Sequence, residues 1–277
     1  MERVEISQGC PAGSVGRRRS SRKLLALAAV ATLTLLVSAC GGDTEKQAEA
    51  AEGQSQQQIA SLPEATTYGK IPDAPMDPEP NAPTEGEVLH PTRELTVHDA
   101  VDGKPIARLP VKQISSPTWV PVIARDGDWA QILLPTRPNG ATGWINTSGD
   151  AVESAENDYL VNVDLDSFHL EILKNGERIG EWTVGIGKPE SPTPTGRAYI
   201  IASIKETVND YSPIVLPLSY HSDSHETYGG GPGTVGIHTW PDNSFVGKAN
   251  SDGCIRVTKD ALEALTQLPL GTIVNIV

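Results

Sequence analysis

Cysteine is scarce in this chain of 277 residues, and its three cysteines are unevenly placed. Cys10 and Cys40 lie in the first 40 residues, which leaves Cys254 as the single thiol of the remaining sequence. A disulfide within that remainder is therefore excluded. An unpaired thiol is either a buried, inert side chain or a nucleophile that a base or a positive field activates.

Aromatic residues and positive charges are also few. Aromatic residues make up 5% of the chain, and all five tryptophans lie between residues 119 and 240, where we expect the hydrophobic cores. Residues 40–277 contain 16 Lys and Arg but 33 Asp and Glu, a net charge of −17. Such a surface repels phosphate polymers, so we expect no nucleic-acid partner.

The chain lacks an apolar run long enough to span a bilayer comfortably. Its longest, Leu24–Val37, has 14 residues and follows the basic stretch Arg17–Lys23, which is typical of a signal peptide covering residues 1–39. Small residues then precede Cys40, an order that resembles a bacterial lipobox. We therefore predict a lipid on Cys40 and an exported lipoprotein, anchored to the outer face of the cytoplasmic membrane and facing the cell wall. Ordinary signal cleavage beside a chance cysteine is the alternative.

Two different regions follow the predicted signal peptide. Residues 40–85 are rich in Gln, Glu, Ala and Pro, so we expect a disordered tether behind the lipidated cysteine. Residues 86–150 contain short alternating segments separated by turn sequences, which predicts four or five strands in a small β-barrel. Gly127-Asp128-Trp129 and Gly143-Trp144 resemble Src-homology-type barrels. We expect both tryptophans to fill the barrel core rather than to bind a ligand.

Residues 158–277 predict a second domain that is also rich in strands. Alternating segments on both sides of Asn175-Gly176 are typical of a β-hairpin. The one helix we expect is short and begins after Thr258. The predicted fold class is therefore mainly β, with a small barrel followed by a β-rich domain whose short helix comes after Cys254.

Cys254 has neighbours in the sequence that could take part in catalysis. His238 precedes it within the same domain, and Gly253 lies directly before it. A glycine there allows a sharp turn whose backbone N–H groups can face a substrate oxygen. For one cysteine and one histidine taken alone, a buried thiol beside an unrelated histidine is the alternative.

The second domain resembles the L,D-transpeptidase catalytic domain of the YkuD type. Four segments carry the resemblance, in the same order along the chain: Val163-Asp164-Leu165, Gly187-Lys188 with Thr193-Pro194-Thr195-Gly196, Gly236-Ile237-His238, and Ser251-Asp252-Gly253-Cys254-Ile255-Arg256. The resemblance implies an acyltransferase that cross-links peptidoglycan stem peptides and releases a terminal D-amino acid, with no cofactor and no metal. The sequence departs from the common pattern at Asp252, often His in the family, and at Thr239, often Gly.

The resemblance also implies residue roles. Cys254 would be the nucleophile that carries the acyl group, and His238 would transfer protons as general acid and base. The backbone carbonyl of Thr239 would orient the imidazole, and the N–H group of Gly253 would contribute to the oxyanion hole. Arg256 would bind a substrate carboxylate or support the loop.

Four further residues are candidates for lining the substrate cleft: Tyr220, His221, Ser251 and Asp252. Ser251 is more typical of a local hydrogen-bonding residue than of a proton carrier. His221 and His225 are spaced like metal ligands on a helix, but no helical period accompanies them, and we predict no metal.

Three alternatives stay open at this point. The glycine-rich segment Tyr228–Gly233 is either a lid over the cleft or a long turn. Water instead of an acceptor amine would make the enzyme an L,D-carboxypeptidase. An inactive catalytic domain would make the protein a wall-binding lipoprotein. The expected partners are donor and acceptor stem peptides and, through the lipid, the membrane.

Overall fold

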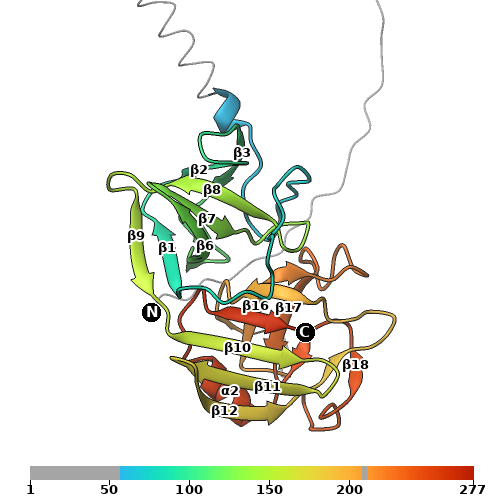
Figure 1. Cartoon of the computed structure of the whole chain (residues 1–277). Coiled ribbons are helices and arrows are strands. Elements are labelled where there is room, and N and C mark those ends of the chain that lie inside the picture. Colours follow the sequence, from blue (N-terminus) through green and yellow to red (C-terminus); the bar gives the residue numbers. More distant parts are fainter. Residues whose placement is uncertain (1–56, 208–210) are drawn as a thin grey trace, which may run out of the picture. The chain divides into compact units, whose positions relative to one another are not determined.

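Strands dominate the part of the chain that the computed structural model describes, residues 57–207 and 211–277. The mainly β prediction is thereby confirmed (Figure 1). The predicted signal peptide, Cys40 and the first part of the predicted tether, residues 40–56, lie outside the described residues. Within the described ranges, no helix is both long and apolar enough to cross a membrane.

An antiparallel sheet of seven strands forms the N-terminal part, in the order β3-β2-β8-β7-β6-β1-β9. It has more strands than the four or five expected: six lie within residues 86–150, and β9 extends the sheet beyond residue 150 by pairing with β1 along five residues. A two-stranded ribbon, β4 with β5, accompanies it. The strands are β1 (Glu87–Pro91), β2 (Leu95–His98), β3 (Pro105–Leu109), β4 (Lys112–Gln113), β5 (Ser116–Pro117), β6 (Val120–Asp126), β7 (Trp129–Leu133), β8 (Thr142–Asn146) and β9 (Val152–Glu156).

The two tryptophans of this sheet do not fill its core, so that prediction was wrong. Trp129 and Trp144 are both partly exposed, whereas Ala130 and Ile132 are fully buried. Successive side chains of a strand point to opposite faces, so burying Ala130 and Ile132 turns Trp129 to the other face of the sheet. There its ring meets the edge of His98, with 5.1 Å between ring centroids.

The segment before β1 differs from the predicted tether. Residues 63–83, named here the N-terminal strap, bury Ala65, Ile71 and Ala74 in the core of the sheet. Backbone bridges tie the strap to Arg108, Arg137 and Ala141. The strap has few large apolar side chains, but backbone pairing satisfies its polar groups and lets small side chains enter the core. Composition alone does not reveal such pairing.

A buried ion pair fixes the strap to the C-terminal domain. Arg197 donates to both oxygens of Asp77, at 2.9 and 2.7 Å, and also to the carbonyl of Ala82. The two charged side chains are only 4% and 2% exposed. A paired geometry with this many hydrogen bonds offsets the cost of removing both charges from water.

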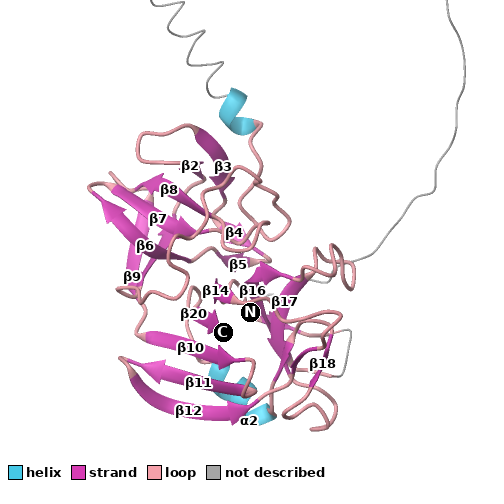
Figure 2. Cartoon of the chain, turned by 45° about the vertical axis from the view of Figure 1, so that its right-hand side comes forward, coloured by secondary structure: helices cyan, strands magenta, loops and turns pink. Residues whose placement is uncertain are grey.

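The C-terminal domain combines two larger sheets. One has the order β12-β11-β10-β20-β14, the other β15-β16-β17-β19, and β13 pairs with β18 beside them (Figure 2). Their bounds are β10 (Tyr159–Asp164), β11 (His169–Lys174), β12 (Glu177–Thr183), β13 (Ile186–Gly187), β14 (Gly196–Tyr199), β15 (Ile204–Lys205), β16 (Ile214–His221), β17 (Thr234–His238), β18 (Ala249–Ser251), β19 (Ile255–Arg256) and β20 (Ile273–Ile276).

The predicted hairpin and helix are both present in this domain. Asn175 and Gly176 connect β11 to β12 with φ angles of 51° and 78°, as a two-residue turn with positive φ at both positions requires. Helix α2 (Lys259–Leu265) directly follows the β19 segment and buries Ala261, Leu262 and Leu265. It packs against β12 and thereby fixes the end of the chain segment that carries Cys254.

Candidate active site

Strand register brings the predicted nucleophile and base to one face of a sheet. β17 and β19 pair in parallel, with Ile237 opposite Ile255 and His238 opposite Arg256. Continuing this register by one residue sets Cys254 beside Gly236, whose backbone acts to lower the pKa of the thiol. Residues two apart on a strand share a face, so Cys254, His238 and Arg256 lie on the same side.

The hydrogen bond made by His238 fixes its tautomer. Its Nδ1 lies 2.7 Å from the carbonyl oxygen of Thr239. A carbonyl can only accept, so Nδ1 carries the proton and Nε2 keeps a free lone pair. Burial lowers the pKa of His238, with the positive charge of Arg256 acting in the same direction. The imidazole is therefore neutral and able to accept a proton at neutral pH.

The carbonyl that orients His238 is itself held in place. Thr239 donates its N–H to Ser212 Oγ at 3.0 Å and its hydroxyl to the carbonyl of Tyr211 at 2.7 Å. The Tyr211 ring meets the imidazole edge-on, with 5.0 Å between centroids. The threonine side chain, which stands where the family often has glycine, thus anchors the residue that orients the base.

The thiol of Cys254 is kept in its protonated form. Burial raises the pKa of Cys254, and the negative charge of Asp252 adds to this, while the Gly236 backbone and Arg256 oppose it. The side chain is nevertheless only partly buried, so a reagent can reach it. A protonated thiol beside a neutral imidazole calls for general-base activation rather than a preformed ion pair.

Ser251 and Gly253 shape the turn before the cysteine. Ser251 donates its hydroxyl to the carbonyl of Cys254 at 2.6 Å, in agreement with a local hydrogen-bonding role. Gly253 has φ of +111°, a conformation that side-chain-bearing residues rarely adopt. Its N–H donates to Ser251 Oγ at 3.2 Å, so a substrate oxygen would have to replace Ser251 as acceptor before Gly253 could act as an oxyanion donor. The serine hydroxyl occupies that donor, because the turn is closed internally.

Thr193 of the Thr-Pro-Thr-Gly segment also supports this turn. Its hydroxyl donates to the carbonyl of Gly253 at 2.9 Å and accepts the N–H of Gly187 at 2.9 Å. The sequence analysis used this segment only as a family signature. A buried threonine hydroxyl with both donor and acceptor partners explains why that residue type stands there.

Arg256 is held at the edge of the site by an aromatic ring and an asparagine. Its guanidinium carbon lies 3.7 Å from the centroid of the Trp240 ring. Its Nη1 reaches the carbonyl and side-chain oxygens of Asn250, at 3.3 and 3.2 Å. Its buried Nε has no hydrogen-bond partner among the described residues. Arg256 therefore supports the loop before Cys254.

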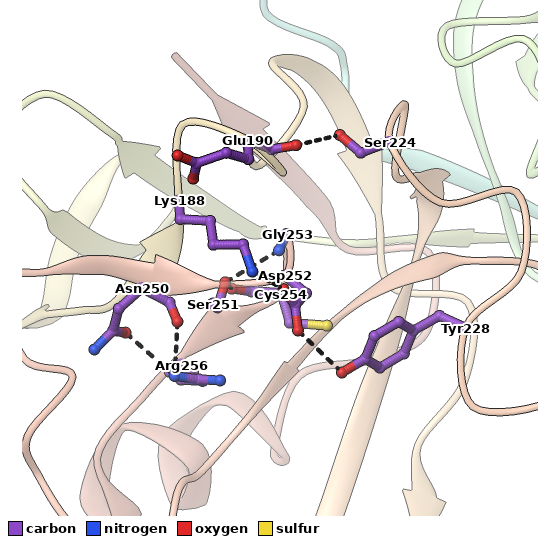
Figure 3. A network of polar contacts seen from close by, with 10 residues as sticks. All are labelled: Lys188, Glu190, Ser224, Tyr228, Asn250, Ser251, Asp252, Gly253, Cys254 and Arg256. Atoms are coloured by element: carbon purple, nitrogen blue, oxygen red, sulfur yellow. Dashed lines mark hydrogen bonds and ion pairs between the residues drawn. The ribbon is translucent and has the colours of Figure 1, made fainter.

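Three side chains from distant segments meet over the cysteine turn. Lys188 Nζ lies 2.5 Å from one oxygen of Asp252, and the hydroxyl of Tyr228 donates to the other at 3.2 Å. We name these residues the Lys188–Asp252–Tyr228 clasp. The hydrogen bond from Lys188 lowers the pKa of Asp252, so the carboxylate stays ionised. In Figure 3, Tyr228 reaches the carboxylate on the side where the sulfur of Cys254 lies.

The sequence analysis named each member of this clasp separately but did not predict their contact. Asp252 was a cleft candidate, Tyr228 began the segment predicted to be a lid or a long turn, and Lys188 was quoted only as part of a motif. Lys188 and Asp252 are 64 positions apart, and no local signal links them. A lysine in one motif and an acid in the next is the only sequence cue that could have suggested the pair.

Tyr220 and His221 do not line a cleft with the cysteine, so those two candidates were wrong. Tyr220 is 4% exposed, and it borders a hollow formed with the strap rather than with Cys254. His221 is fully buried, and its Nε2 contacts the carbonyl and hydroxyl of Thr67. Both residues end β16 where the strap crosses it, and this long-range contact could not be read from local sequence.

His225, the other histidine of the metal-like spacing, contacts a different residue from His221. The ring of His225 packs against Tyr228, with 5.6 Å between centroids. No group of three His, Cys, Asp or Glu side chains in residues 57–207 and 211–277 is arranged to hold a metal ion.

A hollow of about 670 Å³ opens beside Thr239 and Trp240, with the Tyr211 ring in its wall.

The domain that contains this site is similar in sequence to known proteins. Residues 158–276 match the family model of the L,D-transpeptidase catalytic domain, YkuD. The curated YkuD protein of Bacillus subtilis (strain 168), which bears L,D-transpeptidase as a provisional name, is 29% identical over 119 residues. That match covers 43% of this chain and 65% of the relative, so it spans less than two thirds of the relative's length.

Solved structures of L,D-transpeptidases are also similar, at low identity. The enzyme from Mycobacterium smegmatis is 15% identical with a TM-score of 0.37, covering 57% of this chain and 99% of its own. The catalytic domain from E. faecium is 24% identical with a TM-score of 0.35, covering 44% and 98%. The four sequence segments that carry the predicted resemblance all lie within residues 158–276, the range that matches the YkuD family model.

Proposed function

We propose that this protein cross-links peptidoglycan stem peptides through an acyl-enzyme on Cys254. The observation that carries the proposal is the fixed tautomer of His238, whose unprotonated Nε2 belongs to the strand face shared with Cys254. A neutral imidazole held in one orientation beside a protonated thiol is the arrangement that general-base activation of a nucleophile requires.

In the first half-reaction, His238 Nε2 takes the thiol proton as Cys254 Sγ attacks a stem-peptide carbonyl. A carbon–sulfur bond forms, and the carbon–nitrogen bond to the terminal D-amino acid breaks. The imidazolium gives its proton to the departing amine, which restores neutral His238. The Thr239 carbonyl stabilises the imidazolium meanwhile, because the Nδ1 proton points at it.

Backbone and guanidinium donors would stabilise the charge that develops on the substrate. The N–H of Cys254 lies at the turn beside the attacking sulfur, and that of Gly253 would join it on leaving its long bond to Ser251. The guanidinium of Arg256, which is partly exposed at the edge of the site, would bind a substrate carboxylate.

In the second half-reaction, the side-chain amine of an acceptor stem attacks the thioester. Neutral His238 removes a proton from that amine, the new amide forms, and the carbon–sulfur bond breaks. The imidazolium returns its proton to the departing sulfur, which regenerates the thiol and neutral His238. Water could attack the same thioester, in which case the product would be a shortened stem peptide.

The test is to incubate the protein with a purified stem tetrapeptide and to weigh the products by mass spectrometry. Cross-linked dimer and released D-amino acid are expected, and Cys254→Ala should give neither. Tripeptide without dimer would reassign the enzyme as an L,D-carboxypeptidase. A covalent adduct on Cys254→Ala protein would refute the cysteine mechanism, and binding to purified sacculi without turnover by the wild type would favour a wall-binding protein.

The proposal places this reaction outside the cytoplasmic membrane, with Cys40 lipidated and the chain between Cys40 and the strap giving reach toward the wall. It is supported by the basic stretch, the apolar run and the small residues that precede Cys40. Cys40→Ala should release the protein from the membrane fraction. Unchanged membrane association of that variant would refute lipidation at Cys40.

A further inference from the structure

The loop of residues 222–233 contributes Tyr228 to the clasp beside Cys254. Its base is closed by the N–H of Ser222, which donates to the carbonyl of Gly233 at 2.8 Å. Its tip reaches the catalytic turn through the Tyr228 hydroxyl, and Ser224 donates to the carbonyl of Glu190 at 3.0 Å. Figure 3 shows both contacts. The position of this loop therefore sets the surroundings of the thiol.

The loop is poorly suited to hold that position by itself. Most of its residues are exposed, and it includes three consecutive glycines after Tyr228. The paired backbone bonds between Tyr228 and Gly231 shape only its tip. A segment with few buried apolar side chains opens locally at low cost unless groups outside it fix it. The outside groups therefore decide where Tyr228 lies.

One side chain of the N-terminal sheet contacts the loop at three points. Arg137, from the connection between β7 and β8, donates to the carbonyls of Ser222, His225 and Pro232, at 3.1, 3.0 and 3.1 Å. These carbonyls lie at the start, middle and end of the loop. A planar guanidinium carries donors in several fixed directions, so one arginine can hold all three, which a lysine ammonium on a flexible stem cannot do with the same geometry.

Arg137 is itself fixed by the N-terminal strap. Its N–H donates to the carbonyl of Gly69 at 3.1 Å, and its carbonyl accepts the N–H of Ile71 at 2.9 Å. Next to it, Asn139 exchanges two hydrogen bonds with the backbone of His221, at 2.7 and 2.8 Å, just before the loop begins. The strap thus holds Arg137, Arg137 holds the loop, and the loop holds Tyr228 against Asp252.

We propose that Arg137 is a positioning residue for acyl transfer at Cys254, acting through the 222–233 loop and not by contact with the substrate. The inference rests on the proposed function for its catalytic consequence, but its structural step is independent of it. The N-terminal strap and sheet are accordingly part of the working enzyme rather than a spacer before it.

The structural step is tested by limited proteolysis of the full chain. Chymotrypsin cleaves after aromatic residues, and Tyr228 is the one aromatic residue of the loop, 56% exposed. Arg137→Ala should speed cleavage after Tyr228 on the order of tenfold, because local opening becomes easier. Arg125→Ala is the matched control: Arg125 is an arginine of the same sheet, paired with Glu87, and should leave this cleavage unchanged. Equal cleavage rates in wild type and Arg137→Ala would overturn the proposal.

The catalytic step is tested by the rate of acyl-enzyme formation from a stem tetrapeptide, followed by intact mass. Arg137→Ala should lower the acylation rate on the order of tenfold, with Arg125→Ala at the wild-type rate. Tyr228→Phe should lower it as well, and the double variant should lose little beyond the larger single loss, because both changes act through one contact. Full additivity, or a wild-type rate in Arg137→Ala, would overturn the proposal.

Arg137→Lys covers the case in which Arg137→Ala does not fold. It keeps the charge and the backbone pairing with the strap but loses the three-point hold, so it should show both effects in weaker form. Wild-type values for folded Arg137→Lys in both assays would contradict the proposal. If the wild type forms no acyl-enzyme, the proposed function fails, and the proteolysis result alone then decides whether Arg137 positions the loop.

Discussion

His238 and His221 lie at the ends of neighbouring strands and are both buried, yet their chemistry differs. In each case burial is the main cause that lowers the pKa of the ring. The difference lies in which nitrogen is bound. His238 uses Nδ1 to reach the Thr239 carbonyl and keeps Nε2 available, whereas His221 commits Nε2 to Thr67.

The contrast shows that burial and a lowered pKa do not by themselves make a base. His238 shares its strand face with Cys254, and its partner is a carbonyl one residue away in the chain. His221 joins β16 to the strap, 154 positions earlier in the sequence. Under the proposed function, one histidine therefore belongs to the reaction and the other to the assembly of the domain.

The largest effect should come from changing the two histidines to asparagine in turn. His238→Asn removes the base and should lower the rate of acyl-enzyme formation about 10²–10⁴-fold. His221→Asn loses only the link to Thr67 and should lower it less than tenfold. Rates are measured by intact mass with a stem tetrapeptide. Equal losses of rate in the two variants would contradict the assignment of a catalytic role to His238 and a structural role to His221.

Among the contacts of the N-terminal strap, the buried ion pair between Asp77 and Arg197 should contribute most to the free energy of unfolding. Asp77→Ala leaves Arg197 buried without its carboxylate and should lower the free energy of unfolding by about 3–5 kcal/mol. Glu87→Ala breaks the more exposed pair with Arg125 and should cost about 1 kcal/mol or less. Urea denaturation gives both values. A loss in Asp77→Ala no greater than in Glu87→Ala would show that the strap is not fixed by this pair.

The protonation of His221, which contacts the N-terminal strap, should lower the free energy of unfolding in acid. The pKa of His221 is lowered to about 4 from the ordinary 6.5, so the unfolded chain takes up the proton first as pH falls. The stabilisation is complete above pH 6.5 and disappears as pH falls through about 4, a loss on the order of 3 kcal/mol. Denaturation of wild type and His221→Gln at about pH 7 and about pH 4 should show a smaller acid loss in the variant. Equal losses would contradict the buried, neutral state of His221.

The clasp should give the smallest effect on catalysis. Asp252→Asn removes the charge that holds Lys188 and weakens the bond from Tyr228, so acylation should slow by less than tenfold. The hydrogen bond from Lys188 lowers the pKa of Asp252, so this variant should differ from wild type throughout the neutral and mildly acidic range. A loss as large as that of His238→Asn would mean that Asp252 takes part directly in the reaction.

The parts of the fold that local sequence determines were predictable. The Asn175-Gly176 hairpin and helix α2 each follow from a turn signal or a helical pattern within a few residues. The strap was not predictable, because its order depends on backbone pairing with a sheet that follows it. The burial of Ala65 and Ile71 appears in no periodic pattern of the segment itself.

The same distinction holds for the site. Cys254 and His238 could be named because each lies in a short segment that carries the family resemblance. Their placement on one face comes from the pairing of β17 with β19, which the sequence analysis did not predict. Arg137 lies at least 85 positions from the loop carbonyls it binds, and Lys188 lies 64 positions from Asp252. Only the folded chain shows these partners. The bond from the N–H of Gly253 to the Ser251 hydroxyl was also not predictable, because the sequence gives no sign that this hydroxyl turns back toward the glycine.

The central claim, that neutral His238 activates protonated Cys254, is tested most directly by the pH dependence of acyl-enzyme formation. In the wild type the rate should fall with acid only below the ordinary histidine value of 6.5, because the pKa of His238 is lowered. In His238→Asn, whose thiol must ionise unaided, the rate should rise only above the ordinary thiol value of 9.0, because burial raises the pKa of Cys254. A His238→Asn profile that keeps the wild-type acid limb would contradict the account.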